Sequence, residues 1–315
     1  MQDKEGRTIE YLRISVTDRC NLRCRYCMGA QGIPPKTHAE ILSLEEIAEI
    51  AAAAVDCGVR KIRLTGGEPL VRRGIVTLCR QLKAIPGLRE LTMTTNAAGL
   101  APLAAELRAA GLDRLNISLD TLDPARYREI TRLGSLADAL AGLEAARAAG
   151  FARTKLNTVL LGGINDDEIP ALAALTQNEP YSLRFIELMP MGECAHWPRE
   201  RFLPADAVLA ALPGLEPLGM DGVSEVYRLP GAAGTVGLIR PLSHRFCGDC
   251  NRVRLTSDGM LKPCLHAAAE FPLRGLHGAA LRAAFRQAVL AKPARHALAP
   301  NAPSAAGRTM NEIGG

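Results

Sequence analysis

Three closely spaced cysteines constrain this chain more than any other feature. Cys20, Cys24 and Cys27 have the spacing C-x3-C-x2-C and follow the alternating run 11–16, so we expect them on a loop after a strand. Structural zinc sites close with four ligands, and ordinary 4Fe-4S clusters take four cysteines. A set of three therefore predicts a cluster with one iron open to a small molecule. A zinc or electron-transfer site completed by a distant ligand such as His38 is the alternative.

The cysteine loop, with Tyr26 directly before the last cysteine, resembles the cluster loop of the radical S-adenosylmethionine (SAM) superfamily. The resemblance implies that SAM binds the open iron through its amino and carboxylate groups. It also implies that the reduced 4Fe-4S cluster cleaves SAM to methionine and a 5'-deoxyadenosyl radical. In such enzymes the cofactor performs the difficult chemistry, and the protein positions it.

Composition narrows the class of protein further. With 315 residues, 48% of them hydrophobic, the chain can bury a sizeable core. The charged first eight residues resemble no secretory signal, and no apolar run reaches the ~18 residues of a membrane span, so we expect a cytoplasmic location and no membrane partner. Nine cysteines then indicate metal or redox chemistry. A net charge of +5 with 4% aromatic residues makes nucleic acid a weak candidate partner.

Short strand-like runs alternate with helical segments from residue 10 to about 190. One helix begins near Leu44, where Ser43 and Glu46 form a capping box. This alternation predicts βαβ units and a parallel sheet, hence an α/β fold. The expected strands are 11–16, 61–65, 90–96, 114–118, 155–160 and 182–186.

Each expected strand has one apolar and one polar face. Leu12 and Ile14 alternate with Arg13 and Ser15, for example. Parallel strands buried on both faces are almost continuously apolar, so the polar face is expected to line a wet cavity. The superfamily resemblance implies the same architecture, a partial (β/α)6 TIM-like barrel with its site at the carboxyl ends of the strands.

The polar faces carry many basic residues and few carboxylates. A single lysine or arginine at a strand end is usually solvated, but five on different strands with matching parity indicate an anionic ligand. Because guanidinium groups suit phosphate oxygens, we predict a polyphosphate. The five residues are Arg13, Lys61, Arg63, Lys155 and Arg184.

Two further segments at strand ends resemble superfamily motifs. Gly66-Gly67-Glu68-Pro69 resembles the GGEP motif that holds the amino group of SAM, and Glu68 could accept a hydrogen bond from that ammonium. The segment 94–96, Thr-Thr-Asn, resembles the next motif, although Ala97 stands where a glycine is expected.

A second cysteine triplet follows the repeat pattern. Cys247, Cys250 and Cys264 have the spacing C-x2-C-x13-C. A zinc knuckle completed by His244 or His266 is one interpretation. Given the first triplet, a second 4Fe-4S cluster with an open iron is the favoured one.

The second triplet lies in a region of different pattern. Strand-like runs at 225–229 and 237–240 precede it, and a helix near 279–290 and an Ala/Pro-rich linker follow it. We therefore predict a radical SAM partial barrel over 5–220 and a smaller C-terminal α+β region over 221–315 that carries the second cluster.

Four segments together resemble one family, the GTP 3',8-cyclases (molybdenum cofactor biosynthesis protein A). They are 13–20, 61–69, 247–264 and the final Gly-Gly. The resemblance implies a radical SAM lyase that removes the C3' hydrogen of GTP and closes that carbon on C8 of guanine. The product would be 3',8-cyclo-7,8-dihydro-GTP, in the first step of molybdenum cofactor biosynthesis. Two 4Fe-4S clusters and SAM are the implied cofactors, with guanine at the second cluster.

The resemblance also assigns partners and residues. It implies a homodimer, an electron donor such as flavodoxin or ferredoxin, and transfer of the product to cyclic pyranopterin monophosphate synthase. The residues matched to SAM contacts are Tyr26, Gly67, Ser118 and Met189. Those matched to GTP are Arg13, Lys61, Arg63, Thr94, Lys155, Arg184, Arg252, Val253 and Arg254. The catalytic set is Cys20, Cys24, Cys27, Arg252 and Arg254, and all six cysteines of the two triplets are expected metal ligands.

In the same family the glycine tail, here Gly314 and Gly315, enters the active site. The segment 191–197 receives no role. Two other functions stay open at this point. One is a different radical SAM enzyme, such as a peptide-modifying maturase, and the other is a non-catalytic iron-sulfur or zinc protein that senses redox state.

Overall fold

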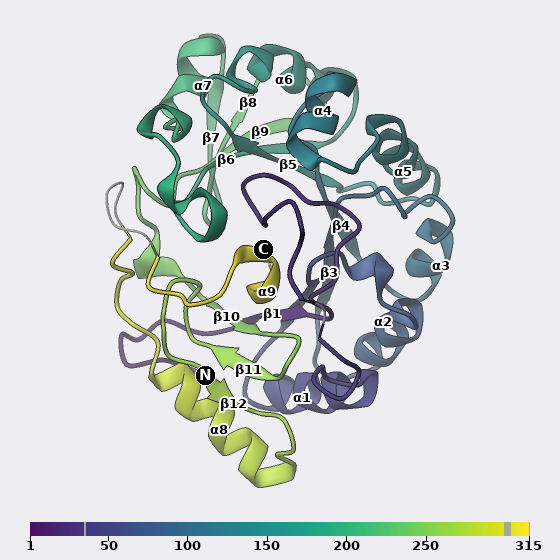
Figure 1. Ribbon diagram of the computed structural model, residues 1–315, viewed down its shortest axis with the longest axis vertical. Coiled ribbons are helices and arrows are strands. Elements are labelled where there is room, and N and C mark those ends of the chain that lie inside the picture. The colour runs from purple at the N-terminus through teal and green to yellow at the C-terminus, as the bar shows by residue number, and fades with distance from the viewer. Residues whose placement is uncertain (35, 299–303, 315) are drawn as a thin grey trace.

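Six parallel strands form the inner wall of a partial barrel (Figure 1). The structure is a computed structural model that describes residues 1–34, 36–298 and 304–314. Its bounds agree with the expected strands to within one residue at either end. The strands are β1 (Tyr11–Ser15), β2 (Lys61–Thr65), β3 (Glu90–Thr95), β4 (Arg114–Ser118), β5 (Lys155–Leu160) and β6 (Ser182–Glu187).

Helices cover the outside of this wall, and the last short helix lies inside the ring (Figure 1). The first begins as predicted: Ser43 Oγ accepts from the Glu46 amide at 3.0 Å, and Glu46 Oε2 accepts from the Ser43 amide at 2.7 Å. The helices are α1 (Leu44–Asp56), α2 (Ile75–Lys83), α3 (Ala104–Ala109), α4 (Pro124–Thr131), α5 (Leu136–Ala148), α6 (Ile169–Asn178), α7 (Asp206–Ala211), α8 (Gly278–Leu290) and α9 (Met310–Ile313).

The C-terminal part of the chain extends the sheet at both edges. β10 pairs in parallel with β1, and β9 pairs in parallel with β6, which gives a twelve-stranded sheet. The predicted boundary at residue 220 falls inside this sheet, at the end of β7, and the division into two domains stays a prediction. The added strands are β7 (Glu216–Asp221), β8 (Ser224–Arg228), β9 (Thr235–Ile239), β10 (Arg252–Leu255), β11 (Met260–Lys262) and β12 (Phe271–Pro272).

The strands have two faces, as their alternation predicts. Their apolar side chains, among them Leu12, Ile62 and Leu115, are fully buried in the core. Register places the cations of the other face side by side: Arg13 lies opposite Arg63 on β2 and opposite Arg254 on β10. The polar faces therefore share one interior. Among the described residues, no helix is long and apolar enough to cross a membrane.

Candidate functional site

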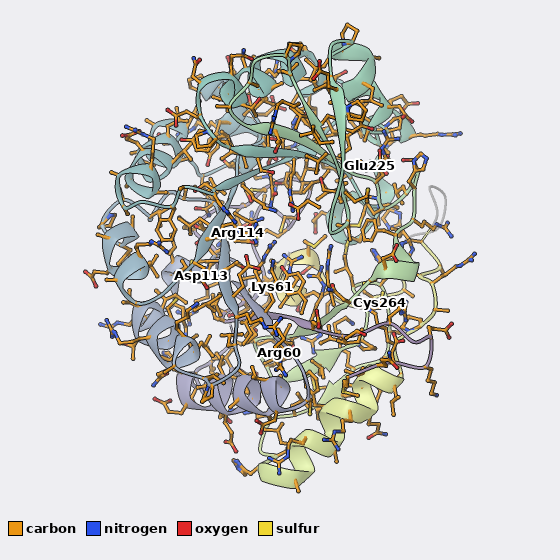
Figure 2. The ribbon with its side chains drawn as sticks, turned by 180° about the vertical axis from the view of Figure 1, so that it is seen from behind. Arg60, Lys61, Asp113, Arg114, Glu225 and Cys264 are labelled. Atoms are coloured by element: carbon orange, nitrogen blue, oxygen red, sulfur yellow. The ribbon has the colours of Figure 1, made fainter. Side chains whose placement is uncertain are left out.

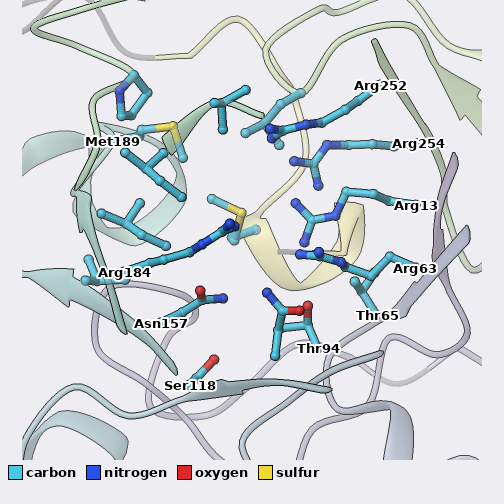
Figure 3. Close-up of a pocket in the computed structure, with 18 of the residues that line it drawn as sticks. Arg13, Arg63, Thr65, Thr94, Ser118, Asn157, Arg184, Met189, Arg252 and Arg254 are labelled. Atoms are coloured by element: carbon cyan, nitrogen blue, oxygen red, sulfur yellow. The ribbon is translucent and has the colours of Figure 1, made fainter. Parts of the chain in front are cut away.

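One cavity of about 490 Å³ lies within the ring and receives side chains from all six barrel strands and from β10 (Figure 3). Both cysteine triplets line it, together with Tyr26, Thr94, Ser118 and Met189. Gly67 lines it as well. The side chain of Val253 packs in the hydrophobic core, and the assignment of this residue to GTP stays a prediction. The basic residues that line the cavity are Arg13, Lys61, Arg63, Arg114, Lys155, Arg184, Arg252 and Arg254.

The first cysteine loop is held in place by neighbours on two sides. Tyr26 Oη donates to Asp120 Oδ2 at 2.7 Å, and Arg132 Nη1 donates to the carbonyl oxygens of Arg23 and Met28, both at 2.9 Å. Within the loop, the Leu22 amide donates to Cys20 Sγ at 3.3 Å. The loop therefore presents its sulfurs to the cavity from a fixed backbone.

The thiols of this loop suit a metal cluster. Burial raises the pKa of Cys20 to about 11 and that of Cys27 to about 12, and it also raises the pKa of Cys24. Thiolates at these positions need a compensating positive charge, which bound iron supplies. Among the described residues, however, no three His, Cys, Asp or Glu side chains are grouped so as to hold one metal ion.

The second triplet lies at the other end of the neighbouring strand. Cys250 comes just before β10, whereas Cys20 comes after the end of parallel β1. Burial alone would raise the pKa of Cys250, but Lys292 and Arg252 outweigh it and lower that pKa. A thiolate ligand is therefore favoured here. Of the histidines considered as extra ligands, His266 lines the cavity.

The GGEP-like loop is packed tightly on the cysteine loop. A Cβ at Gly67 would lie 2.3 Å from the Arg19 carbonyl oxygen, so only glycine allows this approach. Glu68 is buried and accepts from Thr95 Oγ1 at 2.7 Å and from the Asn96 amide at 2.8 Å. Burial raises its pKa to about 7, although these hydrogen bonds oppose the shift. Ala97 takes a φ of 63°, the left-handed conformation for which the expected glycine is suited.

Two carboxylates neutralise part of the cation cluster. Glu90 at the start of β3 pairs with Lys61 and with Arg114, each at 2.5 Å. Asp221 at the end of β7 pairs with Lys155 and with Arg184, each at 2.5 Å. Lys61 and Arg114 lie toward the centre of the ring (Figure 2).

The cations of the cavity, paired or not, also repel one another. Arg184 faces Arg13 and Arg63 across the cavity (Figure 3). Burial, followed by the charge of Arg252, lowers the pKa of Arg254 to about 10. Burial, followed by the charge of Arg184, lowers the pKa of Lys155 to about 7. A polyanion in this cavity would relieve the repulsion.

Several buried polar atoms of the cavity have no hydrogen-bond partner among the described residues. Buried polar groups of this kind are rare in folded proteins, and each needs an explanation. They fit a cavity that hydrogen-bonds a polar ligand. The atoms are Tyr11 Oη, Thr94 Oγ1, Asn116 Oδ1 and Nδ2, Asn157 Oδ1 and Arg184 Nε.

The C-terminal tail closes one side of the cavity. Arg254 Nη1 donates to the Gly314 carbonyl oxygen at 2.6 Å. Gly314 has a φ of 80°, and a Cβ there would lie 2.2 Å from Thr65 Oγ1. The tail thus contacts the predicted site through Gly314, while Gly315 lies outside the described residues.

The segment 191–197, which received no role from the sequence, supports Met189. Cys194 Sγ donates to the carbonyl oxygens of Met189 and Met191, at 3.1 and 3.2 Å. Cys194 is buried, and burial raises the pKa of its thiol. Nothing in the sequence pattern marks this contact, because it depends on a local turn.

Comparisons with known proteins agree with this geometry. Residues 14–176 match the radical SAM superfamily, and residues 181–298 match the molybdenum cofactor synthesis C family. A GTP 3',8-cyclase of Peptoclostridium acidaminophilum is 51% identical over 94% of this chain and 93% of its own. One of Moorella thermoacetica is 49% identical over 100% of both chains.

Solved structures share the fold at low identity. Streptococcus suis SuiB bound to S-adenosylmethionine superposes with a TM-score of 0.59 at 15% identity, over 91% of this chain and 66% of that one. Coproporphyrinogen III oxidase of Escherichia coli, a radical SAM enzyme, gives a TM-score of 0.51 at 16% identity, over 84% of this chain and 67% of that one.

Proposed function

Because the chain belongs to the GTP 3',8-cyclase family of radical SAM enzymes, we propose that it converts GTP to 3',8-cyclo-7,8-dihydro-GTP, the first step of molybdenum cofactor biosynthesis. One observation of the structure supports the proposal independently of the family. Basic side chains from different parallel strands converge on a cavity that both cysteine triplets also line. This arrangement suits a polyphosphate nucleotide that has to reach a radical-generating centre.

Cys20, Cys24 and Cys27 would hold the 4Fe-4S cluster of the radical SAM superfamily. When bound, that cluster supplies the electron that cleaves SAM and so starts radical chemistry on the substrate. Because Gly67 has no side chain, the cysteine loop can pack against it, and Glu68 provides a buried carboxylate near the same loop. Tyr26, Ser118 and Met189 line the adjoining wall, so SAM contacts are assigned to them.

Cys247, Cys250 and Cys264 are proposed to hold a second 4Fe-4S cluster, which takes the guanine base. The lowered pKa of Cys250 supports thiolate ligation there. The cations on the strands would bind the triphosphate, since guanidinium and ammonium groups are its natural partners. Arg252 is the first residue of β10 and Arg254 is the third, and both line the cavity next to the triplet. They would contact the nucleotide between its base and its phosphates and so orient it.

The finer properties of the enzyme are also proposals. They are a homodimer, a cytoplasmic location, a flavodoxin or ferredoxin as electron donor, and cyclic pyranopterin monophosphate synthase as the next enzyme. None of the nine cysteines, all of which lie in the described part of the chain, forms a disulfide, and this fits a reducing compartment. Light scattering of the reconstituted protein would test the dimer directly.

Anaerobic reconstitution with iron and sulfide, followed by SAM, dithionite and either GTP or ATP, tests the function. We expect about eight irons per chain, from two four-iron clusters, and a cyclised product with GTP alone. If 5'-deoxyadenosine forms without any product from GTP, the substrate assignment is wrong. If neither forms in fully loaded protein, the catalytic assignment is wrong.

A double variant tests the arginines of β10. Arg252→Ala with Arg254→Ala is expected to weaken GTP binding while SAM cleavage survives, because both cations line the cavity beside the second triplet. Arg153→Ala, which removes an exposed arginine, is the matched control. Unchanged GTP affinity in the double variant would refute the phosphate assignment.

A further inference from the structure

A single carboxylate already occupies part of the cation cluster. Asp221 Oδ2 accepts from Lys155 Nζ and from Arg184 Nη2, both at 2.5 Å. The two cationic side chains are only 10% exposed, whereas the Asp221 side chain is 56% exposed. The cations are therefore fixed in the cavity wall, and the carboxylate reaches them from solvent.

The element that carries Asp221 lies at the edge of the sheet. β7 is the edge strand of the sheet, all six of its residues are exposed, and its ladder partner is β8 alone. The turn after Asp221 has two residues, and Gly222 takes a φ of 65°, as hairpin turns of this length require. The tip of the hairpin, from Asp221 to Val223, lines the cavity.

A second glycine, Gly237, leaves space for Arg184 to reach this tip. Gly237 on β9 pairs with Arg184 in register. A Cβ at Gly237 would lie 2.4 Å from Ser224 Oγ and 3.2 Å from Arg184 Cγ. The absence of a side chain at residue 237 thus lets the stem of Arg184 cross β9 to the hairpin tip.

Ion pairs with an exposed partner add little to stability, so holding the fold together is a poor explanation for this one. Its chemistry is more informative. A carboxylate oxygen shared by a lysine and an arginine resembles a phosphate oxygen in the same position. On the proposed function, these two cations belong to the triphosphate site, and the carboxylate and the ligand cannot both hold them.

We propose that Asp221 is a built-in competitor at the phosphate site, an internal anion that every phosphate ligand has to displace from Lys155 and Arg184. This inference rests on the proposed function. Displacement lowers the affinity of all ligands that use the two cations by one common factor. Weakly bound anions such as inorganic phosphate are then kept out of the cavity, while GTP retains enough other contacts to bind.

The test compares Asp221→Asn with Glu216→Gln, which removes a charge from an exposed residue of the same strand. Reconstituted protein without reductant is dialysed anaerobically against GTP, inorganic triphosphate or guanosine, first without and then with Mg²⁺. Asp221→Asn is expected to bind GTP and triphosphate roughly tenfold more tightly, which corresponds to two exposed ion pairs. Guanosine binding, and all binding by Glu216→Gln, is expected to stay unchanged.

Three outcomes would overturn the inference. They are equal affinities in Asp221→Asn and the unchanged protein, weaker triphosphate binding in the variant, and weaker binding that appears only with Mg²⁺. The last would make Asp221 a metal ligand. Asp221→Ala repeats the comparison without an amide that could itself hydrogen-bond to the cations. If the unchanged protein binds no GTP at all, the proposed function fails, and this result is distinct from the other three.

Discussion

Lys155 should make the affinity for GTP depend on pH in the physiological range. Burial and the neighbouring charge of Arg184 lower its pKa to about 7, although Asp221 opposes the shift. The protonated form attracts phosphate, so affinity should fall as the pH rises above this value. Arginine at the same position would stay charged throughout, because its ordinary pKa is above 12.

The size of the effect follows from the titration. With a pKa of about 7, about half of the Lys155 side chains carry a proton at pH 7, but only about 3% do at pH 8.5. The Kd for GTP should therefore increase roughly 15-fold over this interval, about 1.6 kcal/mol. This lies within the ~1.5 to 3 kcal/mol that a hydrogen bond to a charged group contributes.

Equilibrium binding of GTP to reconstituted protein at pH 7, 7.75 and 8.5 measures this change. The Lys155→Arg variant reports any titration of the nucleotide itself and should show a much flatter profile. Lys83→Arg, at an ion pair with Asp113 outside the cavity, is the control and should follow the unchanged protein. Parallel profiles for Lys155→Arg and the unchanged protein would refute the assignment of Lys155 to the phosphates.

Three other substitutions test separate parts of the structure. Gly314→Ala would place a Cβ 2.2 Å from Thr65 Oγ1 at a φ of 80°, so product formation should drop more than tenfold while iron content and SAM binding persist; full activity would exclude a role for the tail. Glu68→Gln should weaken SAM binding about 10- to 100-fold at pH 8. In the unchanged protein, the affinity for SAM should fall below pH 7 as Glu68 gains a proton, and a pH-independent affinity would contradict this. Gly142→Ala would bring a Cβ within 2.2 Å of the Ala97 carbonyl oxygen and should cost about 1 to 3 kcal/mol of unfolding free energy, read from urea midpoints; an unchanged midpoint would show that α5 shifts freely.

Local patterns in the sequence predicted the barrel strands well. Apolar and polar residues alternate in these strands, and all but β5 end at a polar residue, so the signals lie within a few residues. The pairing of β10 with β1 was not predictable in this way, since about 240 residues separate Arg13 from its partner Arg254. No local pattern states which distant strand completes an edge.

The residues of the cavity wall also divide into those that a local sequence pattern marks and those that only the tertiary structure brings there. Arg114 was missing from the predicted cations, although it has the parity of Asn116 and Ser118, so alternation within β4 would have been sufficient to find it. Glu90 begins a predicted strand and lies in register with Lys61. Asp221 reaches the cavity from a hairpin outside the βα repeats, and its ion pairs depend on tertiary packing that sequence spacing does not encode.

The parallel pairing of β1 with β10 also fixes the distance between the two cysteine triplets. One cysteine triplet follows β1 and the other brackets the start of β10, so the backbone length of these strands sets the separation of the two triplets. Five residues at about 3.3 Å each give roughly 16 Å. Two more residues in both strands would lengthen the cavity by about 7 Å and keep every cation on the inner face. One extra residue would turn the cations beyond it toward the helices, so a cavity of this design can change length only in steps of two residues.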